Sequence, residues 1–202
     1  MRSDREKQKL IEEFPELQAA DIIFEKEVFA HFGLAFMKFG LVEHSLINIL
    51  TFDNAAQGMI AKTIRDRTGW ENAVDQGFEN AVTLTFGNMV KKVVAIPEFR
   101  DLASAFSDAK CLRDYFAHHF MREEARYLAS EEGCWLLLSK IADVRHKFLS
   151  LDESLKSRFE EMCRRLKIPL PREDQIDAEL TNYRDETDAM LVARSAKVGW
   201  EK

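Results

Sequence analysis

Apolar residues recur at three- and four-residue steps along much of this 202-residue chain. The first long stripe falls between Asp21 and about Leu50, and its large members are Phe29, Phe32, Phe36, Phe39, Leu46, Ile47 and Leu50. Side chains at this spacing share one face of a helix, so the pattern predicts a long helix whose aromatic face is buried or forms a dimer seam. Glu43 lies inside the stripe, where a buried carboxylate needs a partner.

A second stripe predicts another long helix, from Trp135 to about Leu166, with Pro169 and Pro171 ending it. The run Ser130–Gly133 predicts a break before this helix. Its predicted buried face consists of Leu137, Ile141, Val144, Phe148, Leu151, Leu155 and Phe159.

The chain between the two stripes predicts shorter helices. Residues 52–69 are less regular, with turn residues such as Asp53 and Gly58. Residues 72–95 predict one helix, and Pro97 suits the first turn of the next, where its missing N–H costs nothing. Because the chain holds only four prolines and eight glycines, it has room for long helices, and we expect an all-α fold.

The pattern divides the chain into three segments. Residues 1–20 form a charged lead-in, residues 21–168 a helical bundle, and residues 169–202 a strongly charged peripheral C-terminal helix. Apolar residues make up 46% of the chain and charged residues 32%, as in a soluble globular protein.

Composition narrows the functional classes. No stretch reaches 18 uninterrupted apolar residues, so we expect no membrane partner, and the charged N-terminus lacks the apolar run of a secretory signal. We therefore expect a cytoplasmic protein with its three cysteines reduced. Glycine-rich phosphate loops and metal-ligand spacings are absent, so we expect no cofactor and no metal. The net charge of −6 means that any nucleic-acid role must depend on a small local site.

The densest group of chemically active side chains is the run RDYFAHH, Arg113–His119. On an ideal helix Asp114, His118, Arg122 and Arg126 descend one face at four-residue steps. A carboxylate four residues before a histidine can hold its tautomer and raise its pKa, and neighbouring guanidinium groups can bind phosphate oxygens. This set suits metal-free cleavage of a phosphodiester. The same spacing is also typical of a solvated, salt-bridged helix face.

Arg113 does not fit an ideal helix easily. It would point about 140° away from His118, toward the predicted core face that contains Phe116 and Phe120. Two explanations remain open: the helix starts or bends near Arg113, or the arginine is tucked in and paired with a carboxylate such as Glu43.

The stretch LRDYFAHHF resembles the signature of the HEPN superfamily, an arginine followed by a polar residue and by a histidine four to six positions after the arginine. Here these are Arg113, Asp114 and His118, and the superfamily prefers asparagine where this chain has Asp114. Upstream, FGLAFMKFGLVEHSLINIL is similar to the early HEPN helix that carries a glutamate, here Glu43, and TLTFGNMVKKV is similar to the stretch before the motif helix. The likeness covers roughly residues 20–150.

The resemblance implies a bundle of about five long helices with helical extensions at both ends, which dimerises with itself and cleaves RNA without a metal. Such proteins occur in toxin–antitoxin, defence and RNA-processing systems, so an antitoxin or another protein partner is expected. The resemblance implies catalytic roles for Arg113, Asp114 and His118, supporting roles for Glu43 and His119, and RNA phosphate binding by Arg122 and Arg126.

Two other interpretations remain. A HEPN-like module without catalysis could bind RNA, a nucleotide or a protein partner, as the acidic charge and Asp114 suggest. The chain could also be a plain helical scaffold, in which the motif forms only a solvated face.

Overall fold

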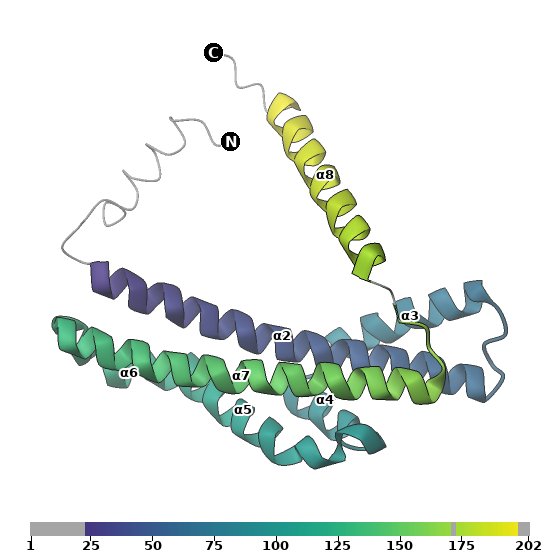
Figure 1. Cartoon of the computed structure of the whole chain (residues 1–202), viewed down its shortest axis with the longest axis horizontal. Helices are drawn as coiled ribbons and strands as arrows, with labels where there is room; N and C mark the ends of the chain where they lie inside the picture. Colours follow the sequence, from purple (N-terminus) through teal and green to yellow (C-terminus); the bar gives the residue numbers. More distant parts are fainter. Residues whose placement is uncertain (1–22, 171–172, 198–202) are drawn as a thin grey trace. The chain divides into compact units, whose positions relative to one another are not determined.

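Helices account for every regular element that the computed structural model describes, in residues 23–170 and 173–197 (Figure 1). The all-α prediction is therefore confirmed, and the lead-in predicted over residues 1–20 lies outside the described residues. Of the short elements, η3 is a π-helical turn, whereas η2 and η4 are 3₁₀ helices. The elements are, in order, α2 (Ile23–Ile60), α3 (Arg67–Val82), α4 (Phe86–Val93), η2 (Pro97–Leu102), α5 (Ala103–Tyr115), η3 (Phe116–Phe120), α6 (Met121–Glu124), η4 (Ala125–Ala129), α7 (Glu131–Leu166) and α8 (Glu173–Lys197).

The described residues form two compact units. The first ends at Met162 and contains α2 and most of α7, and the second begins at Cys163 and contains α8. The helical character predicted for the C-terminal segment is confirmed by α8. All of the site residues predicted from the sequence belong to the first unit.

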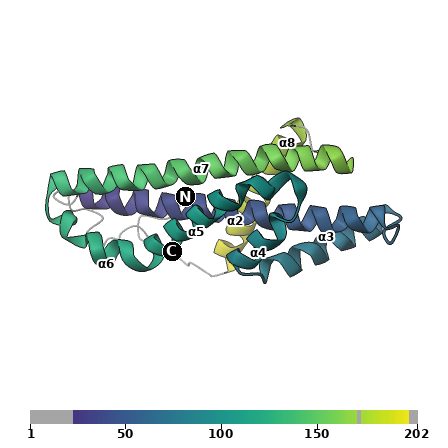
Figure 2. The same ribbon diagram turned by 90° about the horizontal axis from the view of Figure 1, so that it is seen from below.

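The first unit is organised around α2 and α7, which lie side by side and run in the same direction (Figures 1 and 2). Phe24 meets Trp135 near the start of both helices, and Phe52 meets Phe159 toward their ends. The buried residues of α2 are Val28, Ala35, Phe39, Val42, Leu46, Ile49, Thr51, Ala55 and Ala56. In α7, up to the end of the first unit, the buried apolar residues are Cys134, Leu137, Ile141, Val144, Phe148, Leu151, Leu155 and Met162. Most of these residues follow one another at three- and four-residue steps, as in a coiled-coil seam.

The segment from α5 to η4 returns along this pair in the opposite direction. Asp101, just before α5, pairs with Arg158 toward the end of α7. Glu124, at the end of α6, pairs with Lys140 near the start of α7. The return segment therefore carries the RDYFAHH run along the packed pair of long helices.

The prediction of an irregular region over residues 52–69 is largely wrong, because α2 continues to Ile60. Ala55 and Ala56 are buried, so packing carries the helix past residues with weak local turn preferences. The chain turns at Lys62 instead, where φ of 57° lies in the left-handed region. Asp66 then caps α3 by accepting a 2.7 Å hydrogen bond from the backbone N–H of Gly69.

Two further boundaries differ from the predictions. The single helix predicted over residues 72–95 divides into α3 and α4, because Thr85 adopts an extended backbone and its side chain caps α4. The break predicted over Ser130–Gly133 is shorter than expected, because α7 begins at Glu131. Pro97 does lie in the first turn of a helix, the 3₁₀ helix η2.

Phe29 lies outside the core of the first unit, since it is 50% exposed, and the alternative of a dimer seam stays a prediction for this residue. Val28 takes the buried position in the seam instead. Phe32 faces the return segment and stacks on Phe116, with ring centroids 5.4 Å apart. The aromatic residues of α2 thus lie on two faces of the helix, one toward α7 and one toward the return segment. Their spacing alone did not separate these faces.

The apolar character of α2 also bears on membranes. By length and composition alone, Phe24–Ile60 could cross a membrane, and the core helix of a soluble protein meets the same criterion. The seam between α2 and α7 accounts for part of this apolar surface.

Gly133 provides a test of the turn into α7. A Cβ at this position would run into the main-chain carbonyl of Tyr127, whereas a Cβ at Gly87 in α4 would meet no atom within 4 Å. We expect Gly133→Ala to lower the free energy of unfolding by about 2–3 kcal/mol, and Gly87→Ala to leave it unchanged or slightly higher. Urea unfolding followed by circular dichroism measures both, and equal stability of the two variants would contradict the close approach.

Candidate active site

The predicted site residues do not share one straight helix. Arg113 and Asp114 end α5, the two histidines lie in the π-helical turn η3, and Arg122 and Arg126 follow in α6 and η4. A π turn closes hydrogen bonds five residues apart instead of four, and 3₁₀ turns close them three apart. The spacing of an ideal helix therefore does not carry through this segment. Asp114 and His118 remain close enough to interact through their charges, whereas Arg122 contacts His119.

The π turn coincides with an aromatic cluster. Phe116 and Phe120 are both buried, and their ring centroids lie 4.7 Å apart. Both rings also contact Phe32 of α2, at 5.4 and 5.3 Å. This packing keeps the apolar side of η3 against α2, and both histidines of the turn are exposed.

Arg113 turns toward the core, as in the explanation in which the arginine is tucked in and paired with a carboxylate. Its guanidinium carbon lies 5.4 Å from the centre of the Phe39 ring, and its Nη1 lies 3.0 Å from Oδ1 of Asp114. Its Nε is buried and makes no hydrogen bond to any residue that the structure describes. Arg113 is thus a half-buried cation that presents only part of its guanidinium group to solvent.

Glu43 lies close enough to Arg113 to interact with it through its charge. Burial raises the pKa of Glu43, and the positive charge of Arg113 opposes this shift. No hydrogen bond or ion pair joins the two side chains in the described structure. Glu43 therefore contributes a neighbouring carboxyl group, and the direct carboxylate partner of Arg113 is Asp114.

Asp114 is held by two cations. Lys110 Nζ donates to Oδ2 at 2.6 Å, and Arg113 lies against Oδ1. The hydrogen bond from Lys110 is the main reason why the pKa of Asp114 lies below its usual range, and the charges of Arg113 and His118 add to the effect. We expected Asp114 to orient His118, but its two oxygens face Lys110 and Arg113 instead.

His118 has no such restraint. Its ring is exposed and makes no hydrogen bond or ion pair with any residue in the described part of the chain. It lies near enough to Asp114 to influence that carboxylate through its charge. A solvent-facing imidazole beside an Arg–Asp pair can exchange a proton with a ligand.

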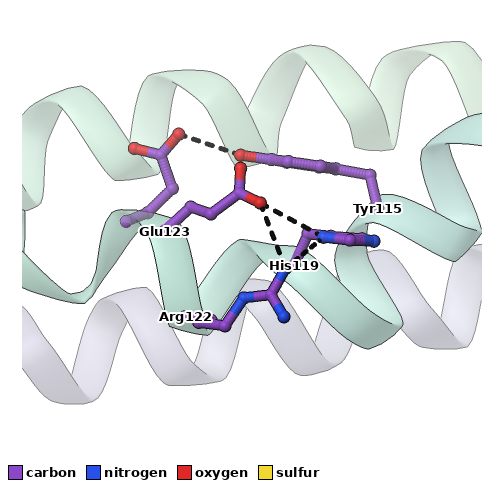
Figure 3. Close-up of polar contacts among 5 residues, drawn as sticks. Tyr115, His119, Arg122 and Glu123 are labelled. Atoms are coloured by element: carbon purple, nitrogen blue, oxygen red, sulfur yellow. Dashed lines mark hydrogen bonds and ion pairs between the residues drawn. The ribbon is translucent and has the colours of Figure 1, made fainter.

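His119 is held much more firmly (Figure 3). Its ring lies parallel to the Tyr115 ring, with centroids 6.3 Å apart and planes 5° apart. Its Nδ1 lies 2.7 Å from Nη2 of Arg122 and 3.1 Å from Oε1 of Glu123. Nδ1 can accept from the guanidinium or donate to the carboxylate, but not both at once. The tautomer of His119 therefore decides which neighbour it binds.

The Tyr115 ring is itself anchored. Its hydroxyl donates to Oε1 of Glu124 at 2.9 Å, and Lys140 of α7 donates to both carboxylate oxygens of Glu124 at 2.8 Å. Burial and this hydrogen bond raise the pKa of Tyr115 to about 12, so the phenol keeps its proton at neutral pH. The chain of contacts thus runs from α7 to the imidazole of His119.

The sequence interpretation missed Tyr115, Glu123, Glu124 and Lys140. Glu123 lies four residues after His119, so helical spacing could have indicated that pair. Lys140 lies on another helix, and no local spacing connects it to Tyr115. Of the two predicted phosphate-binding arginines, Arg122 joins the His119 cluster, as Figure 3 shows.

Arg126 acts on this cluster through its charge, which helps to lower the pKa of Glu124. It packs on the ring of Tyr127 at 4.9 Å and donates a 3.2 Å hydrogen bond to the Tyr127 hydroxyl. Within the described residues, no group of three His, Cys, Asp or Glu side chains could hold a metal ion. The structure therefore pairs Arg113 with Asp114 and His119 with Arg122. His118, which lies between these pairs in the sequence, is exposed to solvent.

The ion pair behind Tyr115 yields a pH-dependent prediction. The hydrogen bond from Lys140 holds the pKa of Glu124 below the usual range of a glutamate. The pair therefore stabilises the fold above the usual pKa and loses its effect as the pH falls through the lowered pKa. We expect Lys140→Gln to cost about 1–2 kcal/mol at pH 7 and much less near pH 3. Urea unfolding at both pH values measures the difference. The control is Lys147→Gln on the same helix, an exposed lysine, and a deficit independent of pH would contradict the assignment.

Comparison with known proteins adds no assignment to this geometry. No significant match to the chain was found among protein-family models, curated proteins or solved structures.

Proposed function

We propose that this chain is a metal-independent endoribonuclease of HEPN type that works as a homodimer in the cytoplasm. The observation that carries the proposal is the exposed imidazole of His118, which lies next to a half-buried Arg113–Asp114 pair. An open proton-transfer group beside a fixed guanidinium is the minimum arrangement for cleaving a phosphodiester without a metal.

The reaction begins at the 2′-hydroxyl of the RNA. His118 takes the hydroxyl proton while the 2′-oxygen forms a bond to the adjacent phosphorus, and the bond from phosphorus to the 5′-oxygen breaks. Water gives a proton to that 5′-oxygen, so the products are a 5′-hydroxyl and a cyclic phosphate. Arg113 stabilises the negative charge that gathers on the phosphate oxygens.

The remaining predicted residues support these two groups. Asp114 fixes the guanidinium of Arg113 through the 3.0 Å contact. Glu43 of α2 places a second carboxyl group near the charge of Arg113. His119 is the second proton-transfer candidate, and its Nδ1 contact with Arg122 leaves Nε2 as the ring atom that can meet a substrate. Arg122 is 69% exposed, so it can bind RNA phosphate despite the acidic charge of the whole chain.

The homodimer is supported by the surface of α2. Leu34, Met37 and Leu41 are exposed along one side of this helix, and the Cβ positions of Gly33 and Gly40 meet no atom within 4 Å. Exposed apolar surface of this kind commonly marks a protein interface. A second copy would bring a second motif into the same assembly, which would increase the local positive charge offered to RNA.

A non-catalytic module that binds RNA, a nucleotide or a protein partner such as an antitoxin is the second candidate. It is favoured by the contacts of Asp114, which neutralises Arg113 and is itself bound by Lys110. In that case the motif would stabilise the fold, and RNA would bind without being cut.

An RNA cleavage assay in the presence of EDTA tests the proposal. We expect the wild type to cut single-stranded or structured RNA and His118→Ala to be at least about 100-fold slower, because general acid–base catalysis contributes that much. His146→Ala removes another exposed histidine, on α7, and is the matched control.

The outcomes separate the two candidate functions. Equal cleavage by wild type and His118→Ala would exclude His118 as the catalytic group. RNA binding in a fluorescence anisotropy assay, with no cleavage at any protein concentration, would favour the binding module. Retained helical circular dichroism in His118→Ala shows that any loss is not caused by unfolding.

A further inference from the structure

The second unit carries its own pattern of apolar residues. Between Ile176 and Met190 of α8, large apolar side chains recur at alternating four- and three-residue steps, and only threonine interrupts the series. Ile176, Leu180, Tyr183 and Met190 are exposed by 43, 60, 74 and 73%. The series is Ile176, Leu180, Tyr183, Thr187 and Met190.

The opposite face of α8 contains no large apolar side chain between Ile176 and Met190. It is made of Ala178, Thr181, Asn182, Asp185, Asp188 and Ala189. A helix with one apolar stripe and one polar face gains most of its stability by packing the stripe against another element. The stripe of α8 follows the heptad pattern of a coiled coil.

The charges beside the stripe identify the partner. In heptad notation Leu180 and Thr187 are a residues, and Glu179 and Glu186 are the g residues that precede them. Arg184 is an e residue, directly after the d residue of its heptad. In a parallel pair, a g residue faces the e residue five positions later on the other helix, because e and g flank the seam. Glu179 would then face Arg184 of the partner subunit.

We infer that α8 forms a parallel coiled coil with α8 of a second copy of this chain. The twofold symmetry of such a pair would form the Glu179–Arg184 contact twice. An antiparallel pair sets g against g, where Glu179 and Glu186 would place carboxylates together. Neither Glu179 nor Arg184 makes an ion pair with another residue that the structure describes, so both are available.

The same helix supplies both members of the ion pair, and this favours a second copy over an unrelated partner. Thr187 and Tyr183 fill the seam less well than leucine or isoleucine would, so the pair should dissociate reversibly. The inference does not depend on the proposed ribonuclease activity, because none of the residues named here belongs to the motif.

A charge swap in the full-length chain tests the pairing. We expect Glu179→Arg to raise the dimer dissociation constant about tenfold in analytical ultracentrifugation, since two attractive contacts become repulsive. Asp185→Arg makes the same change of charge on the outer face and should have little effect. The double variant Glu179→Arg/Arg184→Glu should recover the wild-type constant to within about twofold.

Cysteine cross-linking tests the direction of the two helices. In a parallel pair the two copies of residue 187 share one layer of the seam, so Thr187→Cys should form a disulfide-linked dimer in a redox buffer. Asp185→Cys on the outer face is the control and should not. Both variants carry Cys111→Ser, because Cys111 is exposed in the native chain.

Each result supports or overturns the inference. A monomeric wild type, a dimer whose constant Glu179→Arg leaves unchanged, or equal cross-linking at positions 185 and 187 would overturn it. A dimer that survives Glu179→Arg and still cleaves RNA would leave the proposed function intact while removing this role of α8.

Discussion

The parallel packing of α2 against α7 is the constraint on which the first unit depends. Each helix presents a buried seam at alternating three- and four-residue steps, and ring contacts join the seams from Phe24 to Phe159. Because parallel helices cannot be joined by a short turn, the chain must travel back along the pair before α7 begins. The segment from α5 to η4 makes that return, and it is the segment that carries the candidate active site.

The return path explains the shape of the site. Phe116 and Phe120 must both pack on Phe32, and the helix widens into a π turn at that point. Irregular turns of this kind are often found at functional sites. The turn leaves His118 and His119 exposed while their aromatic neighbours are buried, so apolar packing fixes the backbone that holds the polar groups.

The two histidines of the turn differ in their surroundings. His119 is stacked on Tyr115 and linked through Glu124 to Lys140 of α7, whereas His118 depends on its backbone alone for its position. Arg113 has its own restraints, the Phe39 ring and the Asp114 carboxylate. Among the described residues, the exposed His118 ring therefore lacks a side-chain partner, whereas Arg113 and His119 each have one.

The sequence by itself determined the all-α class and the long helices over most of α2 and α7, and it supplied the candidate site residues. These follow from periodicity and residue type, which are local properties of the chain. It could not fix where α2 ends, since buried Ala55 and Ala56 prolong the helix through contacts with distant segments. It could not choose between the two explanations for Arg113 either.

Only the tertiary structure decided those points. It turned Arg113 onto Phe39 and brought Lys140 to the carboxylate behind Tyr115. The Lys110–Asp114 pair, in contrast, is a four-residue contact within α5 that helical spacing could have indicated. The physical reason is common to Arg113 and Lys140. Helical periodicity predicts which side chains share a face, but the helix type and the charges that arrive from other helices depend on how those faces pack together.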